Sequence, residues 1–352
     1  MKLGLPTGGV RDSSSNANNA ARNGPTRVES IGKPSRAGRV KRSVSLTERE
    51  MEDQVLELPT FASELAGQGV DVDPSHMIFT GSGDSYAASL FAHYLSNGRS
   101  WAGDPQDLAQ SPMICKDKQI FITSVSGRTR ANFILARRLR KIARKRVAIT
   151  ANPTGPLARA CDEIVRLPYR KRDLLTPGTL SFTLSLLAVA SRIRSLPRLR
   201  NLDVMNQDAR TWADNLDVSP RNAFIFVGSG ITYPLAAYGA FKTHETLGLR
   251  ADYAHFEQFG HSKLFSVRES DNIFFLGSDH DEPISSVSRK LALNDFSSHF
   301  LASKLRDPVA AAIDLAFHMQ HLALSLARRR RPTNIAFLTD KKRLRLSCQL
   351  IY

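Results

Sequence analysis

The segment SVSGRT, residues 124–129, brings three hydroxyl side chains and a glycine into one short stretch. It follows an apolar run from Gln119 to Thr123, which is typical of a buried strand, and precedes a helical pattern from Asn132 to Ala143. A loop that ends a strand and opens a helix directs backbone N–H groups, hydroxyls and the positive end of the helix dipole toward one point. Such a point suits a phosphate monoester, although the same residue types also serve as plain turn and helix-capping residues.

A second pattern of strand, turn and helix occurs twice. MIFTGSGDSYAASLFAHYL (residues 77–95) and FIFVGSGITYPLAAYGAFK (residues 224–242) share an apolar strand, a Gly-Ser-Gly turn, a tyrosine at the same offset and an Ala-rich helix. In the first copy, Ser85 would lie at the neighbouring strand end, where it adds a hydroxyl to the phosphate site. The repeat predicts one βα unit used twice through internal duplication.

Neither glycine turn predicts a dinucleotide site. Tyr86 and Tyr233 occupy the place of the third glycine in the dinucleotide-binding motif, and no acidic residue follows a second strand at the required distance. In the second half, the apolar run 272–276 is followed by GSDHDE, whose three carboxylates would repel a phosphate. We therefore expect the phosphate site in the first half only, and no organic cofactor.

Strands alternate with long helical stretches along most of the chain. Further strands are predicted at 119–123, 147–150 and 272–276, and a further helix at 180–193. This alternation predicts an α/β fold of two doubly wound, three-layer domains with parallel sheets, similar to flavodoxin or Rossmann folds. We place the first domain at residues 47–200 and the second at residues 201–326.

A helix is expected before the first strand. Ser45 and Thr47 are candidate N-caps, because Glu48 and Glu50 follow three residues after each of them as in a capping box. Pro59 would limit its far end.

Basic residues are concentrated in three segments of a chain with 49 Lys and Arg, 33 Asp and Glu and a net charge of +16. Residues 1–46 combine basic charge with Ser, Asn and Gly, which predicts a disordered basic tail. Residues 137–146 contain seven Lys and Arg, and a basic C-terminal tail, residues 327–352, contains eight. These segments could bind nucleic acid, but no recognition helix, RNA-binding aromatic signature or zinc finger accompanies them, so we expect solvated faces.

The remaining composition indicates a cytoplasmic protein without a membrane span. Cys115, Cys161 and Cys348 are far apart, which supports neither a disulfide framework nor a zinc cluster. The longest apolar run, residues 180–193, is too short and too interrupted to cross a bilayer, and the N-terminus lacks a secretory signal. His318 and His321 have no third ligand in view, so no metal site is predicted.

The motifs above resemble those of proteins with two sugar-isomerase (SIS) domains, in particular the isomerase half of glucosamine-6-phosphate synthase. The resemblance runs from about residue 47 to about residue 326. It rests on GSGDSY (81–86), on SVSGRT as a variant of the family's Ser-x-Ser-Gly-x-Thr loop, on TPGTLSFTLSLL (176–187) and on GAFKTHETLGLRADYAHFEQFGHSKLF (239–265).

This resemblance implies a role for single residues. Glu245 matches the family's catalytic carboxylate, His261 matches its ring-opening histidine sixteen residues later, and Lys242 matches a lysine on the same helix. In the family this histidine can come from the neighbouring subunit, so a homodimer is implied. The phosphate of a sugar phosphate would be bound by Ser85, Ser124, Ser126, Gly127 and Thr129.

The sequence also departs from the family pattern. Val125 replaces a glutamine in the phosphate loop, Tyr238 replaces an acidic residue, and Ser262 and Lys263 replace Gly-Pro after the histidine. The C-terminal residues do not match the synthase tail, and we expect no glutaminase domain in this chain.

The resemblance favours an enzyme. It implies aldose–ketose isomerisation of a phosphorylated sugar or amino sugar, or a related deamination or deglycation, through an enediol or enolamine. Such chemistry needs one base and an acid that opens the sugar ring. Two alternatives stay open: a phosphoglucose/phosphomannose isomerase, and a regulator that binds a sugar phosphate without turning it over. A nucleic-acid binder driven by charge is a third class.

Overall fold

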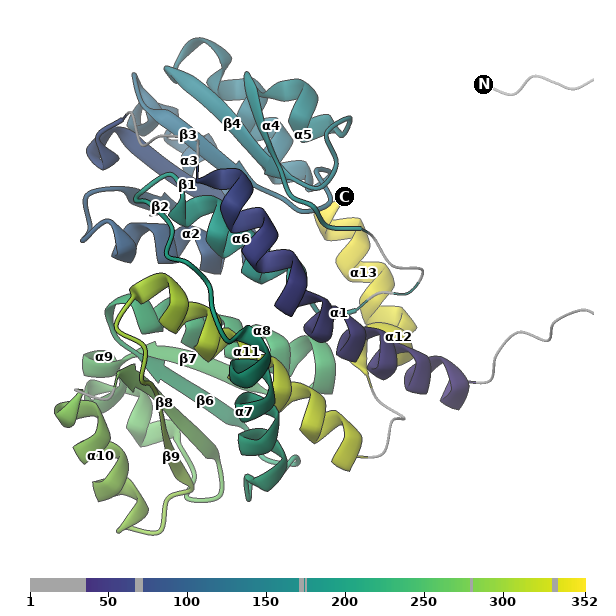
Figure 1. The fold of residues 1–352 in the computed structure, drawn as a ribbon, viewed down its shortest axis with the longest axis vertical. Coiled ribbons are helices and arrows are strands. Elements are labelled where there is room, and N and C mark those ends of the chain that lie inside the picture. The colour runs from purple at the N-terminus through teal and green to yellow at the C-terminus, as the bar shows by residue number, and fades with distance from the viewer. Residues whose placement is uncertain (1–35, 67–71, 171–173, 175, 279–280, 331–334) are drawn as a thin grey trace, which may run out of the picture. The chain divides into compact units, whose positions relative to one another are not determined.

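Nine short segments form two parallel β-sheets in the part of the chain that this computed structural model describes (Figure 1). The described residues are 36–66, 72–170, 174, 176–278, 281–330 and 335–352. Sheet A contains β1 (Met77–Gly81), β2 (Trp101–Gly103), β3 (Gln119–Thr123), β4 (Lys145–Thr150) and β5 (Glu163–Arg166). Sheet B contains β6 (Phe224–Gly228), β7 (Ala251–His255), β8 (Asn272–Ser278) and β9 (Ser298–Ser303).

The central strands are apolar throughout because helices cover both faces of each sheet. Every residue of β1 and of β6 is buried, and Phe79 of β1 pairs with Phe121 of β3. Neighbouring strands run parallel in the order β2-β1-β3-β4-β5 in sheet A and β7-β6-β8-β9 in sheet B. The predicted α/β class with two doubly wound parallel sheets is therefore confirmed. In each sheet, the first strand along the chain lies between the second and the third, and the fourth follows the third. Duplication of a single unit stays a prediction.

Helices connect these strands and extend beyond them at both ends of the described chain. They are α1 (Arg36–Leu65), α2 (Asp84–Leu95), α3 (Pro105–Gln110), α4 (Arg130–Arg138), α5 (Pro156–Ala160), α6 (Leu180–Ala190), α7 (Leu202–Asn215), α8 (Tyr233–Leu247), α9 (Phe256–His261), α10 (Glu282–Ala292), α11 (Pro308–Arg329), α12 (Ala336–Thr339) and α13 (Lys341–Ile351).

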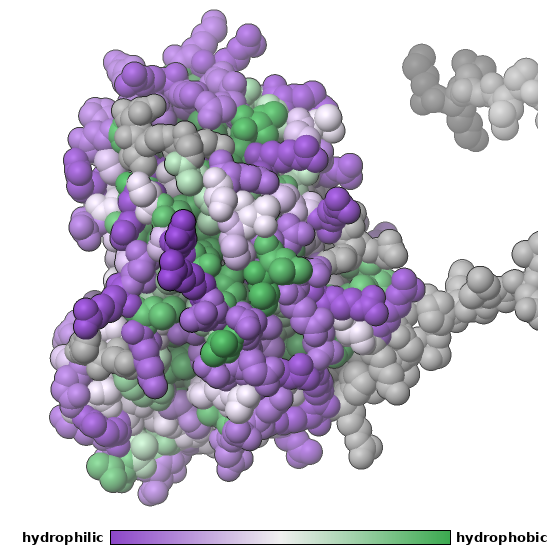
Figure 2. All heavy atoms as spheres, in the orientation of Figure 1, coloured by the Kyte–Doolittle hydropathy of each residue, from purple (hydrophilic) through white to green (hydrophobic). Residues whose placement is uncertain are grey.

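The largest hydrophobic core lies between the two sheets. It combines Phe79 and Phe121 of sheet A, Phe226 and Phe274 of sheet B, and buried residues of α1, α2, α6, α8 and α11. Smaller cores lie on the outer faces, under α3, α4 and α5 for sheet A and under α9 and α10 for sheet B. Figure 2 shows apolar residues reaching the surface mainly in the middle of the view, where the two halves meet.

The two Gly-Ser-Gly turns allow α2 and α8 to begin directly at the strand ends. A Cβ atom at Gly81 would lie 2.6 Å from Ser85 Cβ, and one at Gly228 would lie 2.6 Å from the carbonyl oxygen of Thr232. Glycine, which lacks a Cβ atom, permits this close approach of strand and helix. Because α2 packs on α8, the helices that follow the repeated turns join the two halves.

Helix α1 is longer than predicted at both ends. It begins before the predicted N-caps Ser45 and Thr47 and continues past Pro59. The predicted start and end of this helix are therefore wrong, and residues 36–46 of the predicted disordered tail are helical. Residues 1–35 of that tail lie outside the described part of the chain.

Tertiary packing explains the longer α1. The helix packs against α6, α7 and α11, and Val44 and Met51 are buried with Leu324 of α11. In proteins, burial of one helix face contributes more to helix stability than intrinsic propensity does. The composition of residues 1–46 could not indicate this, because the partner helix lies almost 300 residues away in the chain.

Among the described helices, α11 alone is long and apolar enough to cross a membrane, by length and composition. However, 83% of its apolar window is buried inside the structure, where the helix packs against α7 and α8. The prediction that residues 180–193 form the longest apolar segment is wrong, because α11 is longer. Such burial is typical of a central core helix. In the described part of the basic C-terminal tail, residues 327–329 are the end of α11, and α12 and α13 follow.

Candidate active site

The carboxyl ends of β1 and β3 form the topological switch point of sheet A. The chain leaves β1 toward β2 on one side, whereas β3 lies on the other side, and Gly81 pairs with Thr123 at the ends of these strands. In open α/β sheets this crevice is where ligands bind. The Gly-Ser-Gly turn with Ser85 follows β1, and the SVSGRT loop follows β3, so the topology brings both predicted phosphate-binding segments to one edge.

The SVSGRT loop is held by its carbonyl groups. The carbonyl oxygens of Val125, Ser126 and Gly127 accept hydrogen bonds from Ala151 N (3.1 Å), Asn152 Nδ2 (3.0 Å) and Leu157 N (3.0 Å). Gly127 has φ +62°, and a Cβ atom there would lie 2.9 Å from Thr150 Oγ1. The β4–α5 connection therefore fixes the loop from one side and requires glycine at position 127.

The opposite side of the loop presents donors. Ser124 Oγ lies 3.1 Å from Thr129 Oγ1, and Ser126 Oγ accepts a hydrogen bond from Arg128 N. Within the described residues, the backbone N–H groups of Val125, Ser126 and Thr129 donate to no other group. Thr129 directly precedes α4. Hydroxyls, unsatisfied amides and the positive end of α4 thus lie together, as an anion requires.

A cluster of three charged side chains lies beside this edge. The Lys242 ammonium donates to Asp84 Oδ2 at 2.7 Å and to Glu245 Oε2. Lys242 is 1% exposed, whereas the side chain of Glu245, one turn further along α8, is 26% exposed. The structure therefore brings Lys242 and Glu245 together and adds Asp84, the first residue of α2.

Burial and charge shift the pKa values of this cluster in opposite ways. Burial raises the pKa of Asp84 to about 7, although Lys242 pulls it down, and Glu245 adds to the rise. Burial by itself lowers the pKa of Lys242, but the two carboxylates outweigh it and raise this pKa above its usual value. The lysine stays charged, and Asp84 can exchange a proton near neutral pH.

The TPGT segment before α6 closes over this cluster. A Cβ atom at Gly178 would lie 2.3 Å from Asp84 Oδ2, and the Gly178 carbonyl accepts a 2.7 Å hydrogen bond from Tyr238 Oη. The Tyr238 ring stacks on Phe182 and lies under the Lys242 ammonium. Tyr238, the residue that replaces an acidic one in the family pattern, therefore packs this segment onto α8.

Asp84 was not among the site residues predicted from the sequence. A signal was present, because Asp84 occupies the place of Ile231 in the second copy of the repeat, so that a carboxylate stands where the other copy has an apolar residue. Asp84 Oδ1 is fully buried and has no hydrogen-bond partner in the described structure. Buried polar atoms without a partner are uncommon in proteins, and together with the contact to Lys242 this makes Asp84 a candidate site residue.

His261 does not join the cluster within the described chain. It is the last residue of α9, its side chain is 71% exposed, and it contacts Glu257 at 3.0 Å. No hydrogen bond or ion pair between these described residues connects it to Glu245 or Lys242. The expectation that His261 reaches Glu245 from a neighbouring subunit stays a prediction.

The corresponding edge of sheet B is built differently. Asp281 Oδ2 accepts a hydrogen bond from the backbone N–H of Ser278 at 2.6 Å, directly after β8. The Asp281 carboxylate thus accepts a hydrogen bond from a backbone N–H group at the strand end of sheet B that corresponds to the position of the SVSGRT loop in sheet A. This arrangement supports the expectation that a phosphate binds in the first half only, although a cavity of about 350 Å³ is present there.

The amino-acid sequence matches one known protein-family model. A family model described as the SIS domain matches residues 72–193, which is well under half of the chain. No curated protein sequence matches the chain.

Solved structures match over both sheets. Glucosamine-6-phosphate deaminase from Thermotoga maritima is 18% identical, with a TM-score of 0.67 over 81% of this chain and 94% of that one. The C-terminal domain of glucosamine-fructose-6-phosphate aminotransferase from Francisella tularensis is 17% identical, with a TM-score of 0.64 over 82% and 96%. Tagatose-6-phosphate ketose/aldose isomerase from Escherichia coli is 17% identical, with a TM-score of 0.58 over 83% and 93%. At these identities the likeness shows a shared fold.

Proposed function

We propose that this protein binds a phosphorylated sugar or amino sugar at the carboxyl edge of sheet A and catalyses its aldose–ketose isomerisation, or a related deamination or deglycation. The observation that carries the proposal is the adjacency of two features at the start of α2. Ser85 is a predicted phosphate ligand, and Asp84, directly before it, pairs with Lys242 beside Glu245. The shared fold with a sugar-phosphate deaminase and a ketose/aldose isomerase supports this substrate class.

In this proposal the phosphate anchors the substrate. The SVSGRT loop and Ser85 bind the phosphate, and binding energy from this remote group holds C1 and C2 of the sugar against the acidic cluster. Glu245 is the catalytic base, because its side chain is the most exposed of the three and its partner Lys242 keeps a positive charge next to it. Glu245 removes the C–H proton from the carbon next to the carbonyl or imine carbon of the substrate, which gives the enediol or enolamine, and then delivers this proton to the neighbouring carbon.

His261 supplies the acid that opens the sugar ring, in a homodimer. The histidine is exposed and lies on a short surface helix, and no contact among the described residues holds it toward its own Glu245. A second copy of the chain could therefore receive it.

The free state of all three cysteines supports a location in the reducing cytoplasm.

A second candidate function is that of a sensor that binds a sugar phosphate without turnover. The observation that favours it is that, among the described residues, His261 contacts Glu257 and forms no hydrogen bond or ion pair with Glu245.

Proton NMR in D₂O with fructose 6-phosphate, first without and then with ammonium, tests the proposal. We expect exchange of the C1 or C2 proton for deuterium, and we expect the Glu245→Gln variant to lose this exchange while it retains sugar-phosphate binding. His244→Gln is the matched control, because His244 is exposed on the same helix and bonds only to Ala251. Line broadening of the sugar without exchange would favour the sensor, and exchange at full rate in Glu245→Gln would contradict the catalytic role.

A further inference from the structure

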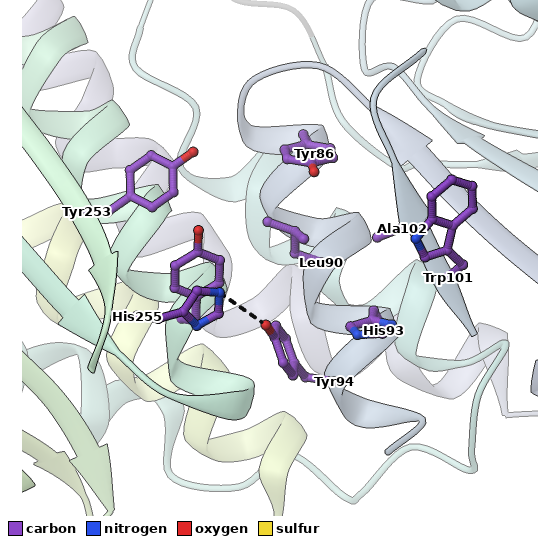
Figure 3. A pocket seen from close by; sticks show the side chains of 9 residues that line it. Tyr86, Leu90, His93, Tyr94, Trp101, Ala102, Tyr253 and His255 are labelled. Atoms are coloured by element: carbon purple, nitrogen blue, oxygen red, sulfur yellow. Dashed lines mark hydrogen bonds between the residues drawn. The ribbon is translucent and has the colours of Figure 1, made fainter. Parts of the chain in front are cut away.

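A pocket of about 320 Å³ lies between the two halves, outside the site described above. Figure 3 shows Tyr86, Leu90 and Tyr94 along α2, between Tyr253 and His255 of β7 and Trp101 of β2. The strands β2 and β7 are the edge strands of sheets A and B. The volume is in the range of pockets that bind small molecules.

The described residues that line the pocket carry no ionic side chain. These nine residues include four tyrosines, two histidines and one tryptophan, but no Asp, Glu, Lys or Arg. Burial lowers the pKa of His255, so this imidazole is neutral at physiological pH, and burial raises the pKa of Tyr233 to about 12. A phosphate finds no cationic side chain in this lining, and the nearest charges are negative: Asp104 and Asp107 act on Tyr86, and Asp252 acts on Tyr233. The pocket therefore suits a ligand that carries no phosphate.

Several polar atoms in the pocket have no hydrogen-bond partner in the described part of the chain. The phenol hydroxyls of Tyr86, Tyr233 and Tyr253 form no hydrogen bond with any described residue. His93 donates from Nδ1 to the Ser100 carbonyl, which leaves its Nε2 as an acceptor when the ring is neutral. Phenol hydroxyls both donate and accept, and this matches the hydroxyl groups of a ligand.

The aromatic rings face in different directions. The ring of Tyr94 is inclined by 77° to Tyr233 and by 68° to His255, and Tyr253 is inclined by 55° to Tyr233. Tyr233 and His255 stack directly on each other, with centroids 3.5 Å apart, so these two rings leave no gap for a flat ligand between them. These four rings therefore form no parallel-sided slot for a planar heterocycle. Aromatic side chains inclined at several angles fit a ligand with a puckered ring, whose C–H groups face the side chains and whose hydroxyl groups point outward from the ring.

We propose that this pocket binds an unphosphorylated sugar ring. The phenol hydroxyls of Tyr86 and Tyr253 bind hydroxyl groups of the sugar. Tyr94 and Trp101, a residue that is 41% exposed, pack against the C–H groups of the sugar. The ligand contacts residues of both halves and bridges the seam between α2 and α8. The site is separate from the SVSGRT loop and does not depend on the proposed catalytic function.

Saturation-transfer NMR with D-glucose, D-galactose and N-acetyl-D-glucosamine, each without phosphate, tests this site. We expect at least one of these sugars to bind the wild-type protein, and we expect the Tyr86→Phe/Tyr253→Phe variant to bind it about tenfold more weakly, because two hydrogen bonds are lost. The variant keeps its fold, since neither hydroxyl bonds to the protein, and circular dichroism checks this. Tyr352→Phe is the matched control, because Tyr352 is exposed at the C-terminus, and its affinity stays at the wild-type value.

Three outcomes would overturn the proposal. The first is that none of the three sugars binds. The second is that adenosine, a flat heterocycle with a pendant sugar, binds through its base protons while the free sugars do not. The third is that sugar affinity falls in Ser126→Ala/Thr129→Ala but not in the double tyrosine variant, which would assign the sugar to the phosphate loop. If the wild-type protein binds an unphosphorylated sugar as expected but does not turn over a sugar phosphate, this would contradict the proposed function and not the proposal for the pocket.

Discussion

The ammonium of Lys242 lies 2.7 Å from Asp84 Oδ2, although the two residues are 158 positions apart in the chain. This ion pair connects the first glycine turn to α8 and joins the two halves at the candidate active site. Lys242 is buried, and both of its partners are carboxylates. Breaking a buried ion pair by removing one partner costs far more than breaking an exposed pair.

We expect Lys242→Met to lower the free energy of unfolding by about 3–5 kcal/mol at pH 8, because two carboxylates then remain without their cation. Urea unfolding followed by circular dichroism measures this. Lys145→Met is the matched control, since Lys145 pairs with Glu163 on the surface with side chains 41% and 40% exposed. It should lose less than about 1 kcal/mol. Equal losses in the two variants would contradict the importance of the buried pair.

Asp84 makes stability depend on pH in a defined direction. Its pKa is raised by burial to about 7 in the folded protein, from a usual value of 3.8. Between these values the folded state holds a proton that the unfolded state has lost, so the contribution of Asp84 to stability falls as pH rises from about 4 to about 7. Above pH 7 both states are ionised, and the contribution is constant.

Asp84→Asn removes this dependence. The unfolding free energy of the wild type, relative to the variant, should fall by up to about 1.4 kcal/mol per pH unit across that window. Urea titrations at pH 4.5, 5.5, 6.5 and 7.5 provide the comparison. Asp162→Asn is the control: hydrogen bonds and charge from Arg146 lower the pKa of Asp162, so it is ionised in both states at these pH values. A wild-type curve parallel to that of Asp84→Asn would disprove the raised pKa.

His321 changes the pH dependence of stability in the direction opposite to Asp84. Burial, with Arg210 and Arg328 nearby, lowers its pKa to about 3 from a usual value of 6.5. Below about pH 6.5 only the unfolded state takes up the proton, so this residue destabilises the protein as pH falls toward 3. We expect His321→Gln, which can still bond to Asn206, to lose less stability than the wild type between pH 7 and pH 5.

The control for this experiment is Thr211→Ala, because Thr211 lies on the exposed surface of α7 and has no ionisable group. Its acid dependence should follow that of the wild type. If His321→Gln and the wild type lose the same stability on acidification, the buried imidazole does not contribute as described.

The phosphate loop is tested by removing hydroxyls. We expect Ser126→Ala/Thr129→Ala to bind a sugar 6-phosphate about 10- to 100-fold more weakly, because hydrogen bonds to a charged group are among the stronger ones. Stability should change little, since these hydroxyls make few bonds within the protein. Isothermal titration with fructose 6-phosphate measures the affinity. Thr211→Ala, on the exposed surface of α7, should bind as the wild type does, and an unchanged affinity in the double variant would remove the loop from the site.

Some features of this protein follow from the sequence because they are local. A strand buried on both faces must be apolar throughout, so the apolar runs alone locate the strands at 77–81, 119–123 and 224–228. The position of the SVSGRT loop was predictable for the same reason, since its strand, glycine and helix start are close together in the sequence, whereas its role in phosphate binding stays a prediction. The resemblance to a family placed Lys242 and Glu245 on one helix, three residues apart.

Only the tertiary structure decided what these local elements touch. Asp84 was not a candidate, because its importance depends on α2 packing against α8, and no pattern within either segment encodes that contact. The same applies to α1, whose length depends on burial against α11, and to the seam pocket, which needs side chains from both halves. Contacts between residues far apart in the chain depend on how the packed layers fit together, and neighbouring residues carry little information about that fit.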